Sequence, residues 1–542
     1  MCDGNEEPRD WEREAQEKFT PYPEEEARRY REAGLWIGRR LDRIAGGAPE
    51  AIALIDAAEA LTYAELEREV AACAAVLRGR GVRSRQPVLL HLPNRVGVVV
   101  MSLALMRCGA LPVYLLDSHR AADVASIAAR ARATAYLSTA PRVAGERGNF
   151  DLLLDAAEVR AQARSQAGEG YEAPVDPGEV AFLQLSGGTT GVPKLIARTH
   201  DDYLYSVLRS NEVCGVSART RMLVVLPATH NYPASSPGYL GVLAAGGAVI
   251  LSENSAPEHA FGLIEEHRPT TVALVPPLAR AWSASAPASG ADLSSVRVVQ
   301  VGGAKLVPQA ARELAAAGPW RVQQVFGMAE GMVCYTTPED TEEQVMGTQG
   351  RPMSPWDEVR IVGPDGRPVP DGASGVLQVR GPYTIRGYWD APEHNARSFT
   401  PDGFYITGDV VRRLSTGHLV VEGRDKDQIN RGGEKISAEE VEDHILAHPA
   451  VFDAAVIGQP DPYLGERACA VVVLREGHAL RRPDLSKFLR ERGLARYKIP
   501  DALRLVEAFP TTRVGKLSRT ELRRELSALV RDRDSEKAAK EQ

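Results

Sequence analysis

The stretch SGGTTGVPK occupies residues 186–194 and follows a short apolar run, AFLQL, at 181–185. Its glycines let backbone N–H groups approach phosphate oxygens closely, while the hydroxyls and the lysine ammonium supply further donors. A Walker A loop has Gly-Lys-Ser/Thr in succession, but here Val192 and Pro193 separate Gly191 from Lys194. The segment therefore predicts a polyphosphate-binding loop outside the P-loop class; a glycine-rich turn without a ligand is the alternative. The candidate phosphate-binding residues are Ser186, Gly187, Gly188, Thr189, Thr190, Gly191 and Lys194.

On both sides of this loop, β-rich runs alternate with Ala/Leu-rich helical stretches between about residues 50 and 300. Examples are the runs at 88–92, 221–227, 271–276 and 296–303. This alternation is typical of parallel sheets covered by helices, so the fold class is α/β. The segment 61–79 has apolar residues at helical spacing and starts with a Thr62/Glu65 capping box, which predicts a helix there.

The pattern changes after residue 358. Short strands and Gly/Pro turns at 358–423 predict a small antiparallel β subdomain. Beyond Arg424, a helix (438–447), two strands (450–457 and 467–474) and a helix (482–493) predict a compact α+β unit. We expect a large N-terminal domain at 1–425, a small C-terminal domain at 426–530 and a charged tail at 531–542, with residues 1–15 frayed.

The composition excludes several classes of protein. The chain has 542 residues, 44% hydrophobic and 25% charged, which matches a soluble globular protein of several folding units. Its net charge is -7, so it lacks the basic excess of a protein that binds nucleic acid or an anionic membrane. The six cysteines have no CxxC spacing and the start has no signal-peptide pattern, so we expect a cytoplasmic protein. We expect its partners to be small molecules or other proteins.

Four further motifs follow the loop: FGMAE at 326–330, YITGD at 405–409, RGGEK at 431–435 and PTTRVGK at 510–516. Together with the loop, they resemble those of the adenylate-forming superfamily, which includes acyl-CoA synthetases, luciferases and the adenylation domains of peptide synthetases. The resemblance covers roughly residues 35–525. It implies a large N-terminal domain followed by a small mobile C-terminal domain, with ATP and Mg²⁺ as cofactors.

The resemblance also implies roles for individual residues. Glu330, together with Thr190, would bind magnesium, and Asp409, assisted by Arg424, would bind the ribose hydroxyls. Lys516 would be the catalytic lysine that bridges the substrate carboxylate and the α-phosphate, and Lys426 a hinge between the domains. Gly303, Ala304, Val325, Phe326 and Gly327 would complete the nucleotide site. No protein nucleophile is needed.

The segment 227–238 is expected to select the acid. Amino-acid-activating relatives carry an aspartate there for the substrate ammonium, but the matching residue here is the neutral Asn231. Asn231 can hydrogen-bond an ortho-hydroxyl, and Tyr232 can flank an aromatic ring. The runs HNYPASSPG, NRGGEK and LRERGLARYKIPD resemble those of the stand-alone 2,3-dihydroxybenzoate-AMP ligases. This resemblance places the acid against His230, Asn231, Tyr232, Ser236, Gly302, Gly327, Val333 and Cys334.

Two positions depart from that subfamily. Cys334 stands where an asparagine is usual, and Leu116-Asp117 replaces a more apolar stretch. Salicylate, 3-hydroxypicolinate and 3-hydroxyquinaldate therefore remain alternative acids. Ser236, Val333 and Cys334 could also be ordinary packing residues, as could His230.

The resemblance implies that the acyl group passes to the phosphopantetheine thiol of an aryl carrier protein on a separate chain. Free coenzyme A is the alternative acceptor. A protein of a different functional class, a scaffold without catalytic activity, is a further alternative. It is disfavoured because the chain contains the loop together with Glu330, Asp409, Arg424 and Lys516.

Overall fold

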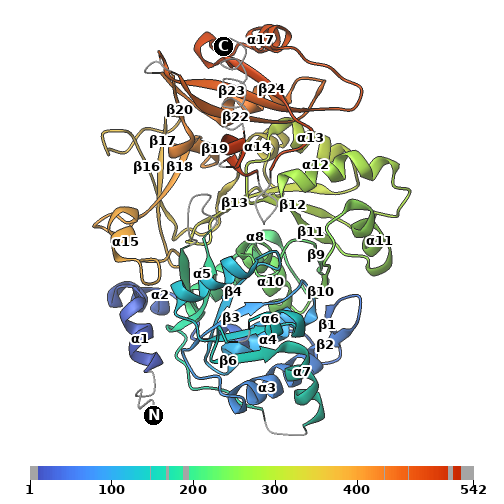
Figure 1. The fold of residues 1–542 in the computed structure, drawn as a ribbon, viewed down its shortest axis with the longest axis vertical. Helices are drawn as coiled ribbons and strands as arrows, with labels where there is room; N and C mark the ends of the chain where they lie inside the picture. Colours follow the sequence, from blue (N-terminus) through green and yellow to red (C-terminus); the bar gives the residue numbers. More distant parts are fainter. Residues whose placement is uncertain are drawn as a thin grey trace, which may run out of the picture.

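The structure is a computed structural model. It describes residues 10–146, 148–166, 170–186, 194–431, 434–461, 463–510, 517–519 and 521–525. Several predicted site residues lie outside these ranges: Gly187, Gly188, Thr189, Thr190, Gly191 and Lys516. The predicted class is confirmed: two large sheets flanked by helices are followed by a small β sheet and a final α+β unit (Figure 1).

The first large sheet has six strands in the order β6-β5-β3-β4-β7-β8 and is parallel except for the β7–β8 pair. Side chains alternate across it, so Val88 and Leu90 join one core cluster and Leu89 joins another. Its strands are β3 (Pro87–His91), β4 (Leu111–Tyr114), β5 (Ala135–Ser138), β6 (Leu152–Asp155), β7 (Val180–Leu185) and β8 (Leu195–Thr199). Both faces are covered by core, as a parallel sheet requires.

The second large sheet has nine strands in the order β15-β14-β13-β12-β11-β9-β10-β1-β2. Its central strands run parallel, so their carboxyl ends meet at one edge, where α/β proteins usually bind ligands. Its strands are β1 (Ile52–Ile55), β2 (Ala60–Thr62), β9 (Arg221–Val224), β10 (Ala248–Leu251), β11 (Thr271–Leu274), β12 (Val298–Gly302), β13 (Arg321–Gly327), β14 (Val333–Tyr335) and β15 (Arg351–Pro352).

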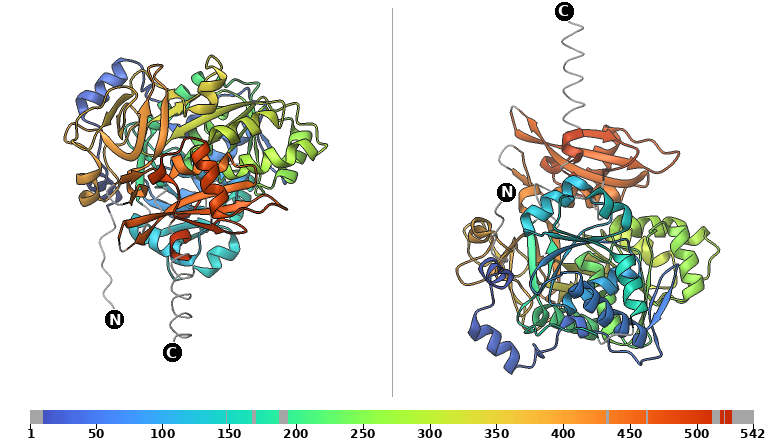
Figure 2. Two further views of the ribbon diagram at one scale, coloured as in Figure 1. Left: turned by 90° about the horizontal axis from the view of Figure 1, so that it is seen from above. Right: turned by 60° about the horizontal axis from the view of Figure 1, so that its bottom comes forward.

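The predicted antiparallel subdomain is present as β16 (Glu358–Val362), β17 (Ser374–Arg380), β18 (Tyr405–Arg413) and β19 (Leu419–Arg424). The last sheet has β20 (Ile429–Arg431), β21 (Glu434–Ile436), β22 (Val451–Asp461), β23 (Gly465–Leu474) and β24 (Ala502–Leu505). It has its own core cluster. In Figure 1 and in the right-hand view of Figure 2, this orange-to-red unit lies at one end of the molecule.

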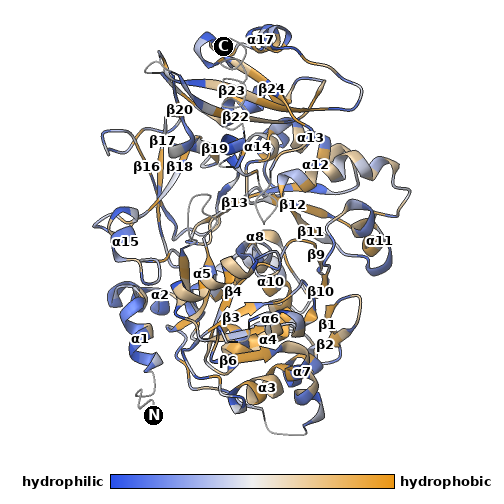
Figure 3. Cartoon of the chain, in the orientation of Figure 1, coloured by the Kyte–Doolittle hydropathy of each residue, from blue (hydrophilic) through white to orange (hydrophobic). Residues whose placement is uncertain are grey.

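The helices complete the two large layers, and Figure 3 shows apolar strands enclosed by more polar elements. The α-helices are α1 (Trp11–Lys18), α2 (Glu24–Glu32), α3 (Tyr63–Gly79), α4 (Val96–Arg107), α5 (Ala121–Ala131), α6 (Ala140–Gly145), α7 (Ala156–Ser165), α8 (His200–Cys214), α9 (Asn231–Ser235), α10 (Gly238–Ala244), α11 (Pro257–His267), α12 (Pro276–Ser285), α13 (Pro308–Ala316), α14 (Glu342–Gly347), α15 (Pro392–Ser398), α16 (Ala438–Leu446) and α17 (Arg482–Glu491). Short 3₁₀ turns occur at η1 (Leu41–Arg43), η2 (Ala286–Ala288), η3 (Asp425–Asp427) and η4 (Arg496–Lys498).

The sequence-based helix over 61–79 is confirmed as α3, with both hydrogen bonds of the Thr62/Glu65 capping box. Residues 11–15, which we expected to be frayed, form the start of α1. Asp10 caps that helix by accepting a hydrogen bond from Arg13 N, and Lys18 pairs with Glu14 one turn away. Within the described ranges, no helix combines the length and the apolar character needed to cross a membrane.

Three ion pairs of the described chain connect the final unit to the helices and loops of the nine-stranded sheet, and one of them joins Arg475 to Glu313 at 3.5 Å. Lys305 lies 2.7 Å from Asp443, and Arg280 lies 2.6 Å from Asp453. Lys305 comes directly after the turn that ends β12, so this edge of the nine-stranded sheet faces the final unit. The predicted site residues Gly302 and Gly327, which end β12 and β13, lie along the same edge.

Candidate functional site

The two ends of the predicted phosphate loop are joined by hydrogen bonds. Ser186 N donates to the Lys194 carbonyl at 2.9 Å, and Lys194 N donates to Ser186 Oγ at 3.0 Å. The residues between them are outside the described ranges. These two hydrogen bonds continue the antiparallel pairing of β7 and β8, which places residues 185 and 195 opposite one another. They fix where the loop begins and ends.

Lys194 projects toward a cluster of rings. Its Nζ lies 2.9 Å from His394 Nε2 and 4.4 Å from the centre of the Tyr388 ring. Burial and the positive charge of Lys194 lower the pKa of His394 below its ordinary value. A neutral His394 can therefore accept a hydrogen bond from the lysine ammonium.

Glu330 ends the FGMAE motif at 326–330 and is 9% exposed. Its Oε1 accepts a hydrogen bond from the Tyr388 hydroxyl at 2.7 Å, and that hydroxyl lies 2.9 Å from the Tyr405 hydroxyl. The buried Arg198 donates to the Ala329 carbonyl at 2.9 Å and so anchors the backbone beside Glu330. A carboxylate has about four acceptor sites, so the Tyr388 bond leaves capacity for a cation.

Asp409 and Arg424 face each other on neighbouring antiparallel strands, β18 and β19. Arg424 Nε lies 2.7 Å from Asp409 Oδ1, and Asp409 N donates to Thr407 Oγ1 at 3.0 Å. The Asp409 side chain is 7% exposed, whereas that of Arg424 is 48% exposed. The structure thus brings together the pair that the sequence assigned to the ribose.

Asn231 begins α9 and is held on two sides. The Tyr203 hydroxyl donates to Asn231 Oδ1 at 2.9 Å. Gln184, oriented so that both ends of its amide are satisfied, accepts from Asn231 N at 2.8 Å and donates to the Thr229 carbonyl at 3.1 Å. Because the Asn231 oxygen is taken by Tyr203, its NH₂ group is the end that can meet a substrate.

Tyr232 packs directly against β12. A Cβ atom added to Gly302 would lie 2.9 Å from Tyr232 Cζ and 2.9 Å from the Val325 carbonyl oxygen. Only a glycine therefore lets the ring lie this close to the strand. Burial and the neighbouring Cys214 thiol raise the pKa of Tyr232 well above its ordinary value, so its hydroxyl stays protonated.

Val333 and Cys334 point to opposite sides of β14. Val333 pairs with Gly327 on β13, lies in the main core cluster and donates its N–H to the Tyr383 hydroxyl at 3.1 Å. Cys334 is fully buried in a different cluster, with Ile196 and Met332. Adjacent strand residues alternate between faces, so the structure gives no support to a direct contact of Cys334 with an acid bound beside Val333.

Most of the remaining predicted residues lie at the ends of β12 and β13 or in and beside α9. Gly302, Gly303 and Ala304 follow one another at the end of β12, while Val325, Phe326 and Gly327 end β13. His230 is the N-cap of α9, where its Nδ1 accepts from Tyr232 N at 3.3 Å, and Ser236 is buried just beyond that helix. Lys426 lies in η3, directly after β19.

Sequence reasoning missed four residues of this site. Arg198, Tyr203, Tyr388 and His394 each contact a predicted residue or its immediate neighbour. The guanidinium of Arg198 also lies 4.8 Å from the Tyr203 ring centre, so a continuous chain leads from Ala329 to Asn231. No local spacing indicates these contacts; for example, Tyr388 and Glu330 are 58 residues apart.

Comparison with known proteins identifies the family. The model of the AMP-binding enzyme matches residues 41–389, and that of the AMP-binding enzyme C-terminal domain matches residues 440–516. The chain belongs to the AMP-binding enzyme family. The first match ends beside Tyr388, and the second covers most of the final α+β unit.

Relatives in this AMP-binding family are similar over nearly the whole chain. A 2,3-dihydroxybenzoate-AMP ligase of Bacillus subtilis is 47% identical, with 94% of this chain and 98% of the relative covered. A salicyl-AMP ligase / salicyl-S-ArCP synthetase of Mycobacterium tuberculosis is 44% identical, with 94% of each chain covered. The apo structure of Mycobacterium smegmatis MbtA has 42% identity and a TM-score of 0.72, covering 94% of this chain and 99% of that chain.

Proposed function

We propose that this AMP-binding enzyme activates an ortho-hydroxy aryl acid, with 2,3-dihydroxybenzoate as the leading substrate, and transfers it to an aryl carrier protein. The names of the similar proteins from Bacillus subtilis and Mycobacterium tuberculosis support an aryl acid. The second name also includes a carrier-protein thioester, written salicyl-S-ArCP. The product of such a route would be a siderophore or a related peptide.

The observation that carries this proposal is the hydrogen bond from Tyr203 to Asn231. The Asn231 side chain is an uncharged amide, and the bond to its oxygen leaves the NH₂ group as the proposed donor to a ligand. A neutral donor suits the hydroxyl or carboxylate oxygen of an aryl acid, whereas an amino acid needs an acidic partner for its ammonium group. Tyr232, against Gly302, supplies an aromatic surface for a ring.

The first half-reaction joins the acid to ATP. A carboxylate oxygen attacks the α-phosphorus, the bond to the bridging oxygen breaks, and pyrophosphate leaves with that electron pair. The 186–194 loop and Lys194 are proposed to hold the phosphates, with Asp409 and Arg424 at the ribose. Lys516 would bridge the carboxylate and the α-phosphate.

Magnesium is proposed at Glu330, together with Thr190. Oxygen ligands suit this ion, which is usually held by one or two carboxylates and the substrate phosphates. The nearly buried carboxylate of Glu330, fixed by Tyr388, fits that requirement. When bound, the ion would neutralise charge on the phosphates. Tyr388 would orient the carboxylate.

The second half-reaction forms a thioester. The phosphopantetheine sulfur attacks the acyl carbon, the acyl–phosphate C–O bond breaks, and AMP leaves while the thiol proton passes to a base or to water. We propose that residues 426–530 rotate about Lys426 between the two steps, relative to residues 1–425. The Lys305–Asp443 and Arg280–Asp453 ion pairs would then belong to only one orientation.

Three other acids and one other acceptor remain within the proposal. Salicylate, 3-hydroxypicolinate and 3-hydroxyquinaldate all keep the ortho-hydroxyl that Asn231 would bind. Free coenzyme A would follow the same chemistry as the carrier thiol. The described cysteines are all free thiols, which suits the reducing cytoplasm proposed as the location.

An ATP–pyrophosphate exchange panel tests the proposal. It compares 2,3-dihydroxybenzoate, salicylate, 3-hydroxypicolinate, 3-hydroxyquinaldate, benzoate, amino acids and fatty acids. Strong exchange confined to ortho-hydroxy aryl acids is expected, with Asn231→Asp losing it because a second anion would face the acid. Exchange only with amino or fatty acids would refute the proposal. Loading of a carrier protein against free coenzyme A then decides the acceptor.

A further inference from the structure

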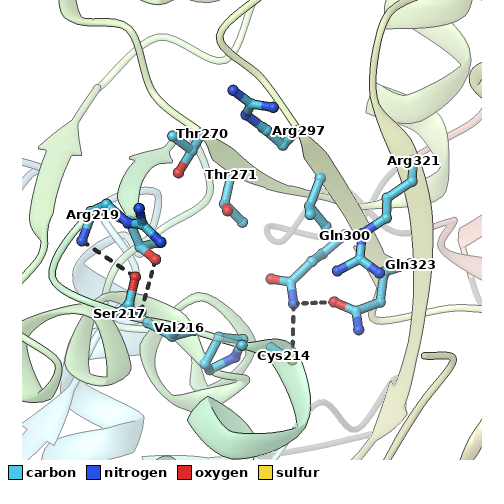
Figure 4. A pocket seen from close by; sticks show the side chains of 14 residues that line it. Cys214, Val216, Ser217, Arg219, Thr270, Thr271, Arg297, Gln300, Arg321 and Gln323 are labelled. Atoms are coloured by element: carbon cyan, nitrogen blue, oxygen red, sulfur yellow. Dashed lines mark hydrogen bonds between the residues drawn. The ribbon is translucent and has the colours of Figure 1, made fainter. Parts of the chain in front are cut away.

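A second pocket opens at the amino ends of the same central strands, opposite the edge that carries the predicted site. It is a hollow of about 210 Å³, and Thr271, Val298 and Arg321, which begin β11, β12 and β13, contribute to its lining. Figure 4 shows Arg219 on one side, Arg321 on the other and Arg297 above. The predicted site residues Gly302 and Gly327 end two of these strands.

The pocket concentrates uncompensated positive charge. Among the described residues that line it are three arginines and no aspartate or glutamate. Ion pairs of the described chain involve none of these three arginines, whereas the nearby Arg268 pairs with Asp292. The chain as a whole has a net charge of -7, so this group of three arginines outside any ion pair of the described residues makes the surface around the pocket locally positive.

The floor of the pocket adds no negative charge. It contains Cys214, whose thiol pKa is raised to about 12 because burial outweighs the effect of the Arg321 charge. The thiol therefore stays neutral near pH 7. At that pH the lining carries the charge of the three arginines alone.

The floor is also a fixed polar surface. Gln323 Nε2 donates to the Thr336 carbonyl at 2.8 Å, which directs Gln323 Oε1 toward Gln300 Nε2 at 2.9 Å. This order leaves Gln300 Oε1 on the pocket side, where it is buried without a hydrogen-bond partner (Figure 4). Gln300 Oε1 thus adds a polar atom beneath the pocket and no negative charge.

We propose that this pocket binds a small multivalent oxyanion, a polycarboxylate or a phosphate ester, at a site separate from the proposed active site. Guanidinium groups on opposite walls can bind two anionic groups of one ligand, each through paired N–H donors. The rim arginines are exposed, so binding weakens as ionic strength rises.

Calorimetric titration with citrate and, separately, with inorganic phosphate tests the proposal. The full-length protein is first saturated with AMP at low ionic strength, so that the nucleotide site is filled. Binding of either anion is expected, and the tighter one identifies the carboxylate or the phosphate class. Arg321→Ala and Arg219→Ala are each expected to weaken binding about tenfold. ATP–pyrophosphate exchange without added anion stays at the wild-type rate.

Arg312→Ala is the matched control, because it removes an exposed arginine from α13, outside the pocket. It is expected to retain wild-type affinity. Failure of both anions to bind, displacement of the anion by AMP, or equal affinity in Arg321→Ala and Arg312→Ala would overturn the proposal. None of these outcomes depends on which acid the enzyme activates, so the test is independent of the proposed function.

Discussion

The Tyr203 hydroxyl donates a hydrogen bond to Asn231 Oδ1 at 2.9 Å, although the two residues are 28 positions apart. Tyr203 belongs to the buried face of α8, and Asn231 begins α9. The bond therefore ties a core helix to the segment proposed to select the acid. It also leaves the NH₂ end of the Asn231 amide as the one that we propose meets the substrate.

Tyr203→Phe should impair recognition of the acid. The change removes the hydroxyl and leaves the nearly buried Asn231 oxygen without its donor, which costs about 1–3 kcal/mol and lets the amide turn. We expect kcat/KM for the aryl acid to fall about tenfold, with the KM for ATP unchanged. ATP–pyrophosphate exchange measures both. Tyr205→Phe is the control: Tyr205 also belongs to α8, but its hydroxyl bonds to Ser354. This variant should keep the wild-type KM for the acid.

Tyr388→Phe should alter the magnesium requirement. The lost hydroxyl holds Glu330 Oε1 at 2.7 Å, so the carboxylate would be less well oriented. We expect the Mg²⁺ concentration for half-maximal exchange to rise by about tenfold while the KM for the acid stays constant. Tyr114→Phe, which removes a buried hydroxyl bonded to Ser102, should leave the magnesium dependence as it is. If the magnesium dependence is unchanged in both variants, Tyr388 does not orient a metal ligand.

Gly302→Ala should displace the Tyr232 ring. The new methyl group would lie 2.9 Å from both Tyr232 Cζ and the Val325 carbonyl oxygen, which is closer than such atoms can approach. We expect a loss of unfolding free energy of about 1–3 kcal/mol and a higher KM for the acid. Denaturant unfolding and exchange kinetics measure the two effects. Gly262→Ala in α11, where a methyl group would meet nothing within 4 Å, should instead stabilise the protein by up to about 1 kcal/mol.

Stability should decrease as the pH falls from about 6.5 toward 4. His200 is buried, its Nδ1 accepts from Leu41 N at 3.1 Å, and burial lowers its pKa to about 4. Over this window the unfolded chain binds a proton that the folded chain does not, so unfolding is favoured by up to about 3 kcal/mol. Denaturant unfolding measured across this pH range should show a smaller slope in His200→Gln. If His200→Gln keeps the wild-type slope while the exposed His259→Gln reduces it, the assignment is wrong.

Local pattern in the sequence was enough to predict α3 and the antiparallel subdomain. Each depends on neighbouring residues: a capping box with helical spacing, or short strands between Gly/Pro turns. The resemblance of complete motifs then indicated Glu330, Asp409 and Arg424 as site residues. Asp409 and Arg424 indeed face each other, because antiparallel register places them opposite.

The tertiary structure decided what those motifs contact. The Tyr388–Glu330, His394–Lys194 and Tyr203–Asn231 contacts join elements that are distant along the chain and leave no periodic signal. The same holds for the pocket between Arg219, Arg297 and Arg321, whose lining combines the end of α8, the loop that follows it and the beginnings of β11, β12 and β13. The sequence by itself determined the local helices and strands and the kinds of side chain in each motif, because both depend on residues that are close together along the chain. Folding decided partners, side-chain orientation and net local charge, because these depend on which strands and helices pack side by side.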